Sequence, residues 1–402
     1  MRRLRILSIA TLFPNPVRPA FGIFVGNQMR AVAARGDVDL TVISPIGLPP
    51  WPLSTRAPYA KLRAIPARSD AVGIDVHYPR FLLVPKVGGD SNSRRIVRAV
   101  LPLARKLHAE QPFDLVDAQF FFPDGPAAAA IAHELGLPLT IKSRGADIHY
   151  WGARPGALRQ MQAAAHRAAG LLAVSQALRD DMIALGMPPE RIVVHYTGLD
   201  RERFRPIERA SARALLSTLP GMAIPPGGPL LVTPGALIAR KGQRLVIAAL
   251  AGLPGTQLAL AGMGEDEGRL RAYAQELGVA DRVHFLGQVG HETLPSLLSA
   301  ADALVLPSAS EGLANVWVEA LACGTPIVIP DIGGAGEVVQ HRSAGRIAAR
   351  TPEAIAAAVT DILDDPPTQQ DVAANAGRFS WSANAENLVA FWNKVLTGQA
   401  LT

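Results

Sequence analysis

The sequence has too few cysteines for disulfide or cysteine-based metal chemistry. Cys323 is its single cysteine, which excludes an intrachain disulfide and a cysteine-rich metal site. We expect Cys323 to be a small buried residue. Such cysteine usage is consistent with a reducing compartment, and we expect a cytoplasmic protein.

Long apolar runs are also missing. No stretch reaches the roughly 18 uncharged apolar residues that a membrane-spanning helix requires. The basic, apolar N-terminal segment resembles a signal peptide, but Arg5 interrupts its short apolar run and no small-residue cleavage site precedes Pro14. We therefore expect this segment to form a first buried strand, in a protein that is soluble or peripheral to a membrane.

Aromatic residues make up only 5% of the chain, and no zinc-finger or RNA-recognition motif is present. These absences argue against nucleic acid as a partner. Acidic residues are scarce in the first half: residues 1–200 hold 24 Lys and Arg against 15 Asp and Glu, whereas residues 201–402 hold 16 against 19. The basic first half indicates an anionic partner such as a membrane or a phosphate compound.

What the sequence does contain is a long alternation of short apolar runs and helical patterns, which predicts parallel sheets covered by helices. A polar, Pro- and Gly-rich stretch at 198–229, with one short helical piece, separates two such series. We predict α/β architecture with two facing, doubly wound Rossmann-like domains, at 1–199 and 200–379, and a C-terminal helix at 380–397 that completes the first. The predicted strands are 6–10, 40–43, 115–118, 139–141, 171–174, 192–194, 230–233, 257–261, 283–286, 303–306 and 326–329. The predicted helices are 23–35, 94–110, 126–135, 157–169, 176–185, 242–251, 265–277, 291–300, 315–323 and 352–363.

Open α/β sheets bind ligands at the carboxyl ends of their strands, so functional residues are expected in the loops that follow strands, along a cleft between the domains. The richest such segment is Ser308–Pro326, which follows the strand 303–306 and enters a helix. The amides from Gly312 through Leu313 and Ala314 to Asn315 lie at a helix N-terminus, which favours a diphosphate. Glu319 could accept hydrogen bonds from ribose hydroxyls and Glu311 from sugar hydroxyls, although either alone could be a solvated acid on a capped helix.

Two glutamates separated by seven residues, and followed by Gly324-Thr325-Pro326, give this segment a specific resemblance. It resembles the donor-site motif of glycosyltransferase family 4, and the resemblance covers nearly the full chain. It implies the GT-B fold, retention of anomeric configuration, Glu319 on the donor ribose and Glu311 on the transferred sugar. It also implies a UDP- or GDP-sugar co-substrate, with no other cofactor.

Further segments match the same family. Arg240 and Lys241 follow the strand 230–233 and would neutralise the departing diphosphate, although a basic helix start is the alternative. Many members carry Arg where this chain has Ala236. Gly262 and Gly264 match the glycine loop near the nucleotide.

The first domain offers less specific matches. Gly22 opens the helix after the first strand and permits close approach of the donor. Arg144 replaces the His of the family's His-Gly-x-Asp segment; it would bind the donor phosphate or an acceptor anion, or be an ordinary surface arginine. Asp147 of that segment and Asp124 are acceptor-side candidates, and Asp124 is equally explained as a helix cap.

A metal site is not expected. Asp37-Val38-Asp39 has the form of a metal-binding acid pair but precedes a strand, so we predict turn residues there. No cluster of His and Cys offers another site.

The family resemblance implies a retaining, metal-independent hexosyltransferase. Residues 11–16, 21–28 and 120–125 resemble a subgroup of the family that acts in cell-surface polysaccharide synthesis, including teichuronic-acid-type transferases, so we expect the protein to have a role in that synthesis. Its acceptor would be a carbohydrate or a polyprenyl-lipid-linked sugar. The alternatives are a non-catalytic sugar-nucleotide-binding protein and a GT-B sugar synthase or phosphorylase. A nicotinamide-dependent dehydrogenase is disfavoured because strand 6–10 lacks a following G-x-G-x-x-G. Residues 94–108 read either as a basic amphipathic helix on the inner face of the membrane or as a core-packed helix with a solvated basic face.

Overall fold

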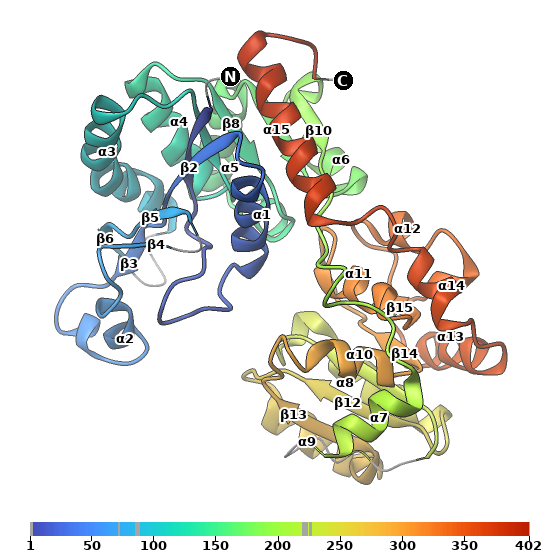
Figure 1. The fold of residues 1–402 in the computed structure, drawn as a ribbon. Coiled ribbons are helices and arrows are strands. Elements are labelled where there is room, and N and C mark those ends of the chain that lie inside the picture. The colour runs from blue at the N-terminus through green and yellow to red at the C-terminus, as the bar shows by residue number, and fades with distance from the viewer. Residues whose placement is uncertain (1–2, 71–72, 85–88, 219–223, 225–226, 402) are drawn as a thin grey trace. The chain divides into compact units, whose positions relative to one another are not determined.

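The computed structural model describes residues 3–70, 73–84, 89–218, 224 and 227–401 (Figure 1). Its contacts divide the chain into two compact units. Unit 1 is Met1–Gly198 together with Trp381–Thr402, and unit 2 is Leu199–Ser380. Residues 219–223 and 225–226 of the expected linker lie outside the described residues, and its short helical piece is α7 (Arg209–Ser217).

In the described part of unit 1, the main sheet has the strand order β10-β9-β8-β7-β1-β2-β5-β4. Neighbouring strands are parallel except for the antiparallel pair β4–β5. A separate parallel pair is formed by β3 (Ile46–Leu48) and β6 (Arg80–Leu82). The strands of the main sheet are β1 (Leu4–Ile9), β2 (Val38–Ile43), β4 (Arg68–Asp70), β5 (Asp75–His77), β7 (Leu115–Ala118), β8 (Leu139–Lys142), β9 (Gly170–Ala173) and β10 (Ile192–Val194).

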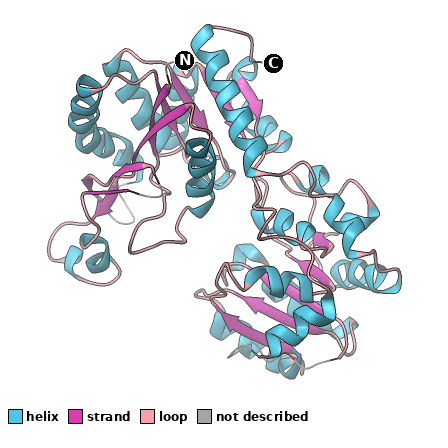
Figure 2. Cartoon of the chain, viewed as in Figure 1, coloured by secondary structure: helices cyan, strands magenta, loops and turns pink. Residues whose placement is uncertain are grey.

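Helices lie on both faces of this sheet, as the alternating pattern predicted (Figure 2). On one face α1 (Ile23–Ala34) packs against α15 (Trp381–Thr397), and side chains from both enter the core with β1 and β2. On the other face α4 (Asp124–Leu135) contacts α3 (Asn92–Glu110) and α5 (Pro155–Arg167). The remaining helices of unit 1 are α2 (Tyr59–Arg63) and α6 (Gln176–Ala184), with short turns η1 (Leu53–Thr55), η2 (Gly89–Ser91), η3 (Asp147–Trp151) and η4 (Pro189–Arg191).

In unit 2, the described strands form one parallel sheet in the order β13-β12-β11-β14-β15-β16. The strands are β11 (Leu230–Pro234), β12 (Gln257–Ala261), β13 (Val283–Gly287), β14 (Ala303–Val305), β15 (Ile327–Ile329) and β16 (Gly345–Ile347). Its helices besides α7 are α8 (Gln243–Ala249), α9 (Glu267–Glu276), α10 (Leu294–Ala300), α11 (Asn315–Ala322), α12 (Ala335–Val338), α13 (Pro352–Asp364) and α14 (Gln369–Ala374). The short turns are η5 (Ala239–Lys241), η6 (Leu250–Gly252), η7 (Ala280–Arg282) and η8 (Arg342–Ala344).

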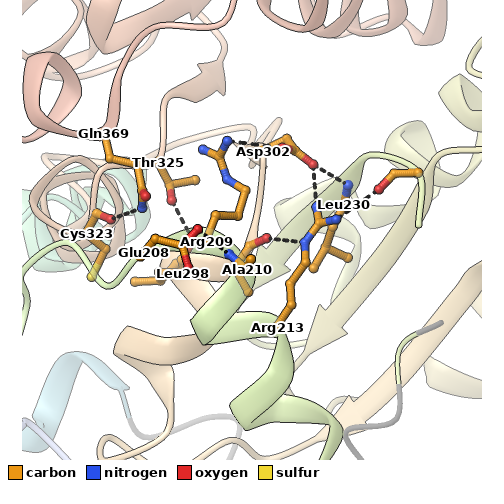
Figure 3. A network of polar contacts seen from close by, with 12 residues as sticks. Glu208, Arg209, Ala210, Arg213, Leu230, Leu298, Asp302, Cys323, Thr325 and Gln369 are labelled. Atoms are coloured by element: carbon orange, nitrogen blue, oxygen red, sulfur yellow. Dashed lines mark hydrogen bonds and ion pairs between the residues drawn. The ribbon is translucent and has the colours of Figure 1, made fainter. Parts of the chain in front are cut away.

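At the amino edge of this sheet, Asp302 ties α7 to the strands (Figure 3). Its Oδ2 accepts hydrogen bonds from Arg213 and from the Leu230 amide, both at 2.7 Å, and its Oδ1 lies 3.4 Å from a guanidinium nitrogen of Arg209. Asp302 directly precedes β14. A partly buried carboxylate is thus paired and hydrogen-bonded, which offsets the cost of removing its charge from water.

The expected strands and helices are all present, with ends shifted by a few residues. The sequence interpretation missed the short strands β3 to β6 with α2, and β16, α12 and α14 in unit 2. These elements are three to six residues long, too short to display a period of 2 or 3.6.

Cys323 is fully buried, as predicted, and burial raises the pKa of its thiol to about 12. Of the two acids expected in a turn, Asp37 directly precedes β2 and pairs with Arg35. Asp39 lies within β2, where it pairs with Arg3, so the turn prediction is wrong for this residue. Within the described residues, no helix combines the length and the apolar character needed to cross a membrane.

The structure distinguishes between the two interpretations of the basic, amphipathic sequence that forms helix α3. Its apolar side packs inward, where Ile96, Val100 and Ala104 are fully buried. Arg105 pairs with Glu134 on its outer side. The helix is therefore core-packed with a solvated basic face, and its buried apolar side cannot insert into lipid.

Candidate functional site

Both main sheets have a point at which the strand order reverses, and ligands of open α/β sheets bind at such points. In unit 2 the strand order reverses between β11 and β14, which are neighbours in the sheet although β12 and β13 intervene in sequence. Loops that leave the carboxyl ends of two such strands diverge to opposite faces and open a crevice. The chain that leaves β11 carries Arg240 and Lys241, and the chain that leaves β14 carries Glu311.

The structure brings these three charged residues together. Lys241 Nζ lies 2.5 Å from Glu311 Oε1, and Arg240 Nη1 lies 3.4 Å from the same oxygen. Arg240 also donates to the Ser310 carbonyl at 2.6 Å. The side chains of Lys241 and Glu311 are only 15% and 12% exposed, whereas that of Arg240 is 41% exposed. The pair is thus partly shielded, and Arg240 forms its solvent-facing edge.

Backbone contacts hold the two loops in this register. The Ala309 amide donates to the Arg240 carbonyl at 2.7 Å. Gly242 adopts φ 76°, and a Cβ there would lie 2.4 Å from the Pro307 carbonyl oxygen. Only glycine permits this conformation and this approach, so η5 and its two cations are fixed against the end of β14.

The glycine loop after β12 packs on the same assembly. A Cβ on Gly262 would lie 1.9 Å from the Gly235 carbonyl oxygen, and one on Gly264 would lie 2.1 Å from the Leu237 carbonyl oxygen. The Leu237 amide donates to the Met263 carbonyl at 3.1 Å. Both predicted donor-binding glycines therefore have a structural role: they let this loop lie against the segment that leads to Lys241.

The segment after Glu311 turns into α11 as expected. Gly312 and Leu313 are buried in a bend, Ala314 is the N-cap, and α11 begins at Asn315. The Gly312 carbonyl accepts a hydrogen bond from the Gly334 amide at 2.7 Å, which fixes the bend from outside.

Glu319 lies one turn into α11, on the same helix face as Asn315. Burial raises the pKa of its carboxyl to about 7. Among the described residues, no side chain or amide donates a hydrogen bond to this carboxylate. A partly buried carboxylate without a protein partner can accept hydrogen bonds from a ligand.

In unit 1, Gly22 and Arg144 lie in the loops after β1 and β8. Gly22 is the N-cap of α1 with φ 65°, and a Cβ there would lie 2.5 Å from the Leu12 carbonyl oxygen. Arg144 donates to Gln119 Oε1 at 2.6 Å and to Gln28 Oε1 at 3.1 Å. Burial lowers the pKa of its guanidinium to about 10, so it stays charged at neutral pH. It is a partly buried cation, not an ordinary surface arginine.

The two acceptor-side candidates lie in the interior of unit 1. Asp124 and Asp147 are fully buried, so neither carboxylate is available to an acceptor in this structure. Asp124 Oδ2 accepts the Thr11 amide at 2.9 Å, and Asp147 Oδ2 accepts the Phe121 amide at 2.7 Å. Burial raises the pKa of Asp124 to about 7 and also raises that of Asp147. Their role is to hold the loops after β1 and β7.

The sequence interpretation missed a buried polar network beside Arg144. Lys142 is fully buried; its Nζ lies 2.5 Å from His195 Nδ1 and 3.2 Å from Gln28 Oε1. His195 Nε2 lies 2.9 Å from the Asn384 carbonyl of α15. Burial lowers the pKa values of both Lys142 and His195. The available signal was a lysine at the end of the predicted buried strand that became β8.

Solved structures identify the architecture. Sucrose-phosphate synthase from Thermosynechococcus elongatus aligns with a TM-score of 0.79 at 21% identity, covering 99% of this chain and all of that one. Anabaena HepE in complex with UDP-glucose aligns with a TM-score of 0.73 at 21% identity, covering 98% of this chain and all of that one. At this level of identity the likeness defines the fold, which is GT-B, as predicted.

Family models give the membership. The model described as Glycosyltransferase Family 4 matches residues 21–203, and the model described as Glycosyl transferases group 1 matches residues 220–379. The chain belongs to the glycosyltransferases that these two models define.

Individual relatives differ in their sequence identity to this chain and in the length over which they align with it. The putative teichuronic acid biosynthesis glycosyltransferase TuaC of Bacillus subtilis is 27% identical over 362 residues, 89% of this chain and 88% of the relative. D-inositol 3-phosphate glycosyltransferase 2 of Catenulispora acidiphila is 36% identical over 218 residues, which is 50% of each chain. The chain thus spans about half the length of that curated relative.

Proposed function

We propose that this protein transfers a hexose from a UDP- or GDP-sugar to a hydroxyl of a carbohydrate or lipid-linked acceptor, with retention of anomeric configuration and without a metal. Its place would be the synthesis of a cell-surface polysaccharide, in the cytoplasm at the inner face of the membrane. The alternatives are sugar-nucleotide binding without turnover and a GT-B synthase or phosphorylase activity.

The contact between Lys241 and Glu311 carries the proposal. The transferred sugar departs from a diphosphate, on which negative charge develops in the transition state. Fixed cations aimed at that charge lower the barrier because they need no reorganisation during the reaction. Lys241 and Arg240 lie at the switch point between β11 and β14, where a GT-B donor would place its diphosphate.

The same contact suggests how the site keeps its charges balanced before the donor binds. Without donor, the Glu311 carboxylate neutralises Lys241 at 2.5 Å. With donor, the diphosphate would neutralise Lys241 and Arg240, and Glu311 would accept hydrogen bonds from hydroxyls of the sugar. Glu319, which has no donor to its carboxylate among the described residues, would accept hydrogen bonds from the ribose.

The reaction can be balanced without a protein nucleophile. The bond from the anomeric carbon to the diphosphate oxygen breaks, and its electron pair leaves with the diphosphate. The acceptor oxygen forms the new bond to the same face of the anomeric carbon. Its proton passes to the departing diphosphate, so the products are a glycoside and a nucleoside diphosphate.

The relatives support the donor and acceptor classes. HepE is described with UDP and with UDP-glucose, which favours a uridine nucleotide among the donors. The name of the Bacillus relative points to a cell-wall polysaccharide. The basic balance of residues 1–200 is consistent with an anionic acceptor or an anionic membrane.

The test is release of nucleoside diphosphate by purified protein from UDP- and GDP-sugars, with and without a bacterial lipid extract. We expect one donor to give release that the extract stimulates, with a glycosylated product of retained configuration. Donor binding by calorimetry without release in any mixture would favour the non-catalytic alternative. Product analysis separates a synthase or phosphorylase, and absence of both binding and release would overturn the proposal.

A further inference from the structure

The chain between β3 and β4 carries the most exposed aromatic side chain in the described residues. Trp51 is 80% exposed and Leu53, two residues on, is 45% exposed. This excursion, defined here as residues 49–67, contains η1 and α2 and extends away from the other elements of unit 1 (Figure 1). A large aromatic side chain left in water forgoes a substantial hydrophobic stabilisation, so its exposure favours a function in contact with a partner.

The excursion is anchored, so the exposure of Trp51 does not reflect a loosely attached loop. Leu62 and Ile65 are buried and belong to the hydrophobic core of unit 1. At its near end, the Ser54 amide donates to the Pro50 carbonyl, and Thr55 Oγ1 donates to the Pro52 carbonyl at 2.7 Å. The core thus fixes the base of the excursion, and the apolar side chains at its tip are held in solvent.

Charge on the excursion has one sign only. Residues 40–69 contain no Asp or Glu, whereas Arg56, Lys61 and Arg63 are all exposed. Within the described part of the chain, none of these three cations makes an ion pair. By contrast Arg68, just beyond the excursion, pairs with Asp75. Three unpaired cations beside an exposed tryptophan suit an anionic surface that is apolar beneath its charges.

A lipid bilayer with anionic headgroups is such a surface. Tryptophan is enriched at the level of the headgroups, because its ring is apolar and its N–H is polar. Basic residues near an anionic leaflet each add electrostatic attraction. A protein partner would need a complementary acidic groove around Trp51, whereas a bilayer needs only the two features that the excursion has.

We propose that the excursion docks unit 1 onto an anionic membrane, with Trp51 and Leu53 at the boundary between headgroups and acyl chains. Arg56, Lys61 and Arg63 then contact lipid phosphates. The proposal rests on the proposed function in one respect, since a lipid-linked acceptor gives the enzyme a reason to be at the membrane. The excursion, and not α3, then supplies the apolar contact with the membrane, because the apolar side of α3 is buried in unit 1.

The test is co-sedimentation of the full-length protein with vesicles of phosphatidylcholine alone or of phosphatidylcholine mixed with phosphatidylglycerol. We expect binding to the mixed vesicles, weakened by salt. The double variant Trp51→Ala with Leu53→Ala should lower the partition coefficient at least about tenfold, and Trp51→Phe should retain most of it. Neutralising Arg56, Lys61 and Arg63 with Gln should lower it by a similar factor.

Matched control variants carry the same kinds of substitution at exposed positions outside the excursion. Arg94→Gln with Arg98→Gln and Arg159→Gln removes three exposed cations from α3 and α5, and Leu215→Ala removes a 47% exposed apolar side chain from α7. Both controls should bind vesicles like the unaltered protein. Calorimetry measures donor binding in the absence of lipid, and so tests the proposed function separately. The donor affinity should be the same in every variant.

Several results would overturn the docking proposal. These are wild-type protein that binds neither kind of vesicle, excursion variants that bind like wild type, and loss of binding only in the α3 control. Retained vesicle binding with absent donor binding would instead count against the proposed function. A stable complex with another protein that Trp51→Ala abolishes, without any vesicle binding, would assign the excursion to a protein partner and refute the lipid assignment.

Discussion

Lys241 Nζ and Glu311 Oε1 lie 2.5 Å apart although 70 residues separate them in the chain. Their two loops leave β11 and β14, the neighbouring strands at which the sheet of unit 2 reverses its order. The pair therefore marks the switch point with one charge of each sign. A donor diphosphate would compete with Glu311 for the same cation.

The two cations should contribute unequally to transfer. Lys241→Met keeps much of the apolar stem but removes the charge from the partly buried pair, and we expect kcat to fall about 100- to 1000-fold. Arg240→Ala removes a more exposed cation, and we expect a loss of about tenfold because solvent screens it. Steady-state release of nucleoside diphosphate measures both. Thermal unfolding serves as the control for folding, and equal rates in wild type and both variants would contradict the assignment.

The raised pKa of Glu319 predicts a pH dependence of stability. The folded carboxyl holds its proton up to about pH 7, whereas the unfolded one releases it near 4.5. The folded state therefore binds more protons between these values, and the free energy of unfolding falls as pH rises from about 4.5 to 7. Glu319→Gln removes this loss, so the variant should gain up to about 3 kcal/mol relative to wild type between pH 4.5 and 8.

Urea unfolding at a series of pH values measures this difference. All other groups titrate alike in the two proteins, so only the relative slope matters. Parallel curves would contradict the role of burial. Donor affinity should behave in the opposite sense: it should strengthen as the wild-type carboxylate ionises through about pH 7, and Glu319→Gln should abolish that strengthening.

The loop after β12 offers a steric test. Gly262→Ala would place a Cβ 1.9 Å from the Gly235 carbonyl oxygen, so the backbone that leads to Lys241 has to shift. We expect a loss of stability of about 1–3 kcal/mol and a loss of transfer activity that exceeds it. Gly268→Ala in α9 is the matched control, since its Cβ meets nothing within 4 Å and should be neutral or slightly stabilising. Equal effects of the two variants on activity and unfolding temperature would count against this packing.

The Asp302 network should matter for stability and leave the chemistry intact. Asp302→Ala leaves Arg213 without its carboxylate and the Leu230 amide without an acceptor, which we expect to cost about 2–4 kcal/mol. Glu134→Ala breaks an exposed pair with Arg105 and should cost less than about 1 kcal/mol. Calorimetric unfolding compares them. Asp302 precedes β14 and Glu311 follows it, so the transfer rate of folded Asp302→Ala should stay near that of wild type; a large loss would place the network in the site.

The alternation of apolar runs and helical patterns was enough to predict the architecture. Long helices such as α13 display the helical period, and buried strands such as β12 display a continuous apolar run. The short strands β3 to β6 could not be found this way. Each has three residues, and β4 is largely exposed, so neither period nor apolar content marks them. The sequence prediction therefore contains no element for the excursion between β3 and β4.

Some residues of the candidate site could be predicted from the sequence, and others could not. Lys241, Arg240 and Glu311 lie in loops after strands, and the position after a strand is readable from sequence. The burial of isolated polar residues cannot be predicted from sequence, so the full burial of Asp124 and Asp147 was not expected. The same limit hid Lys142 and His195, whose contacts join residues 53 positions apart.

Helix α15 has a consequence for the order in which the protein forms during synthesis. Leu388, Phe391 and Trp392 fill the core of unit 1 beside residues from β1 and α1. A ribosome delivers residues 381–397 only after it has made every residue of unit 2, which is continuous in sequence. We therefore expect unit 2 to reach its native packing first, while a nascent unit 1 waits with an incomplete core that a chaperone would recognise.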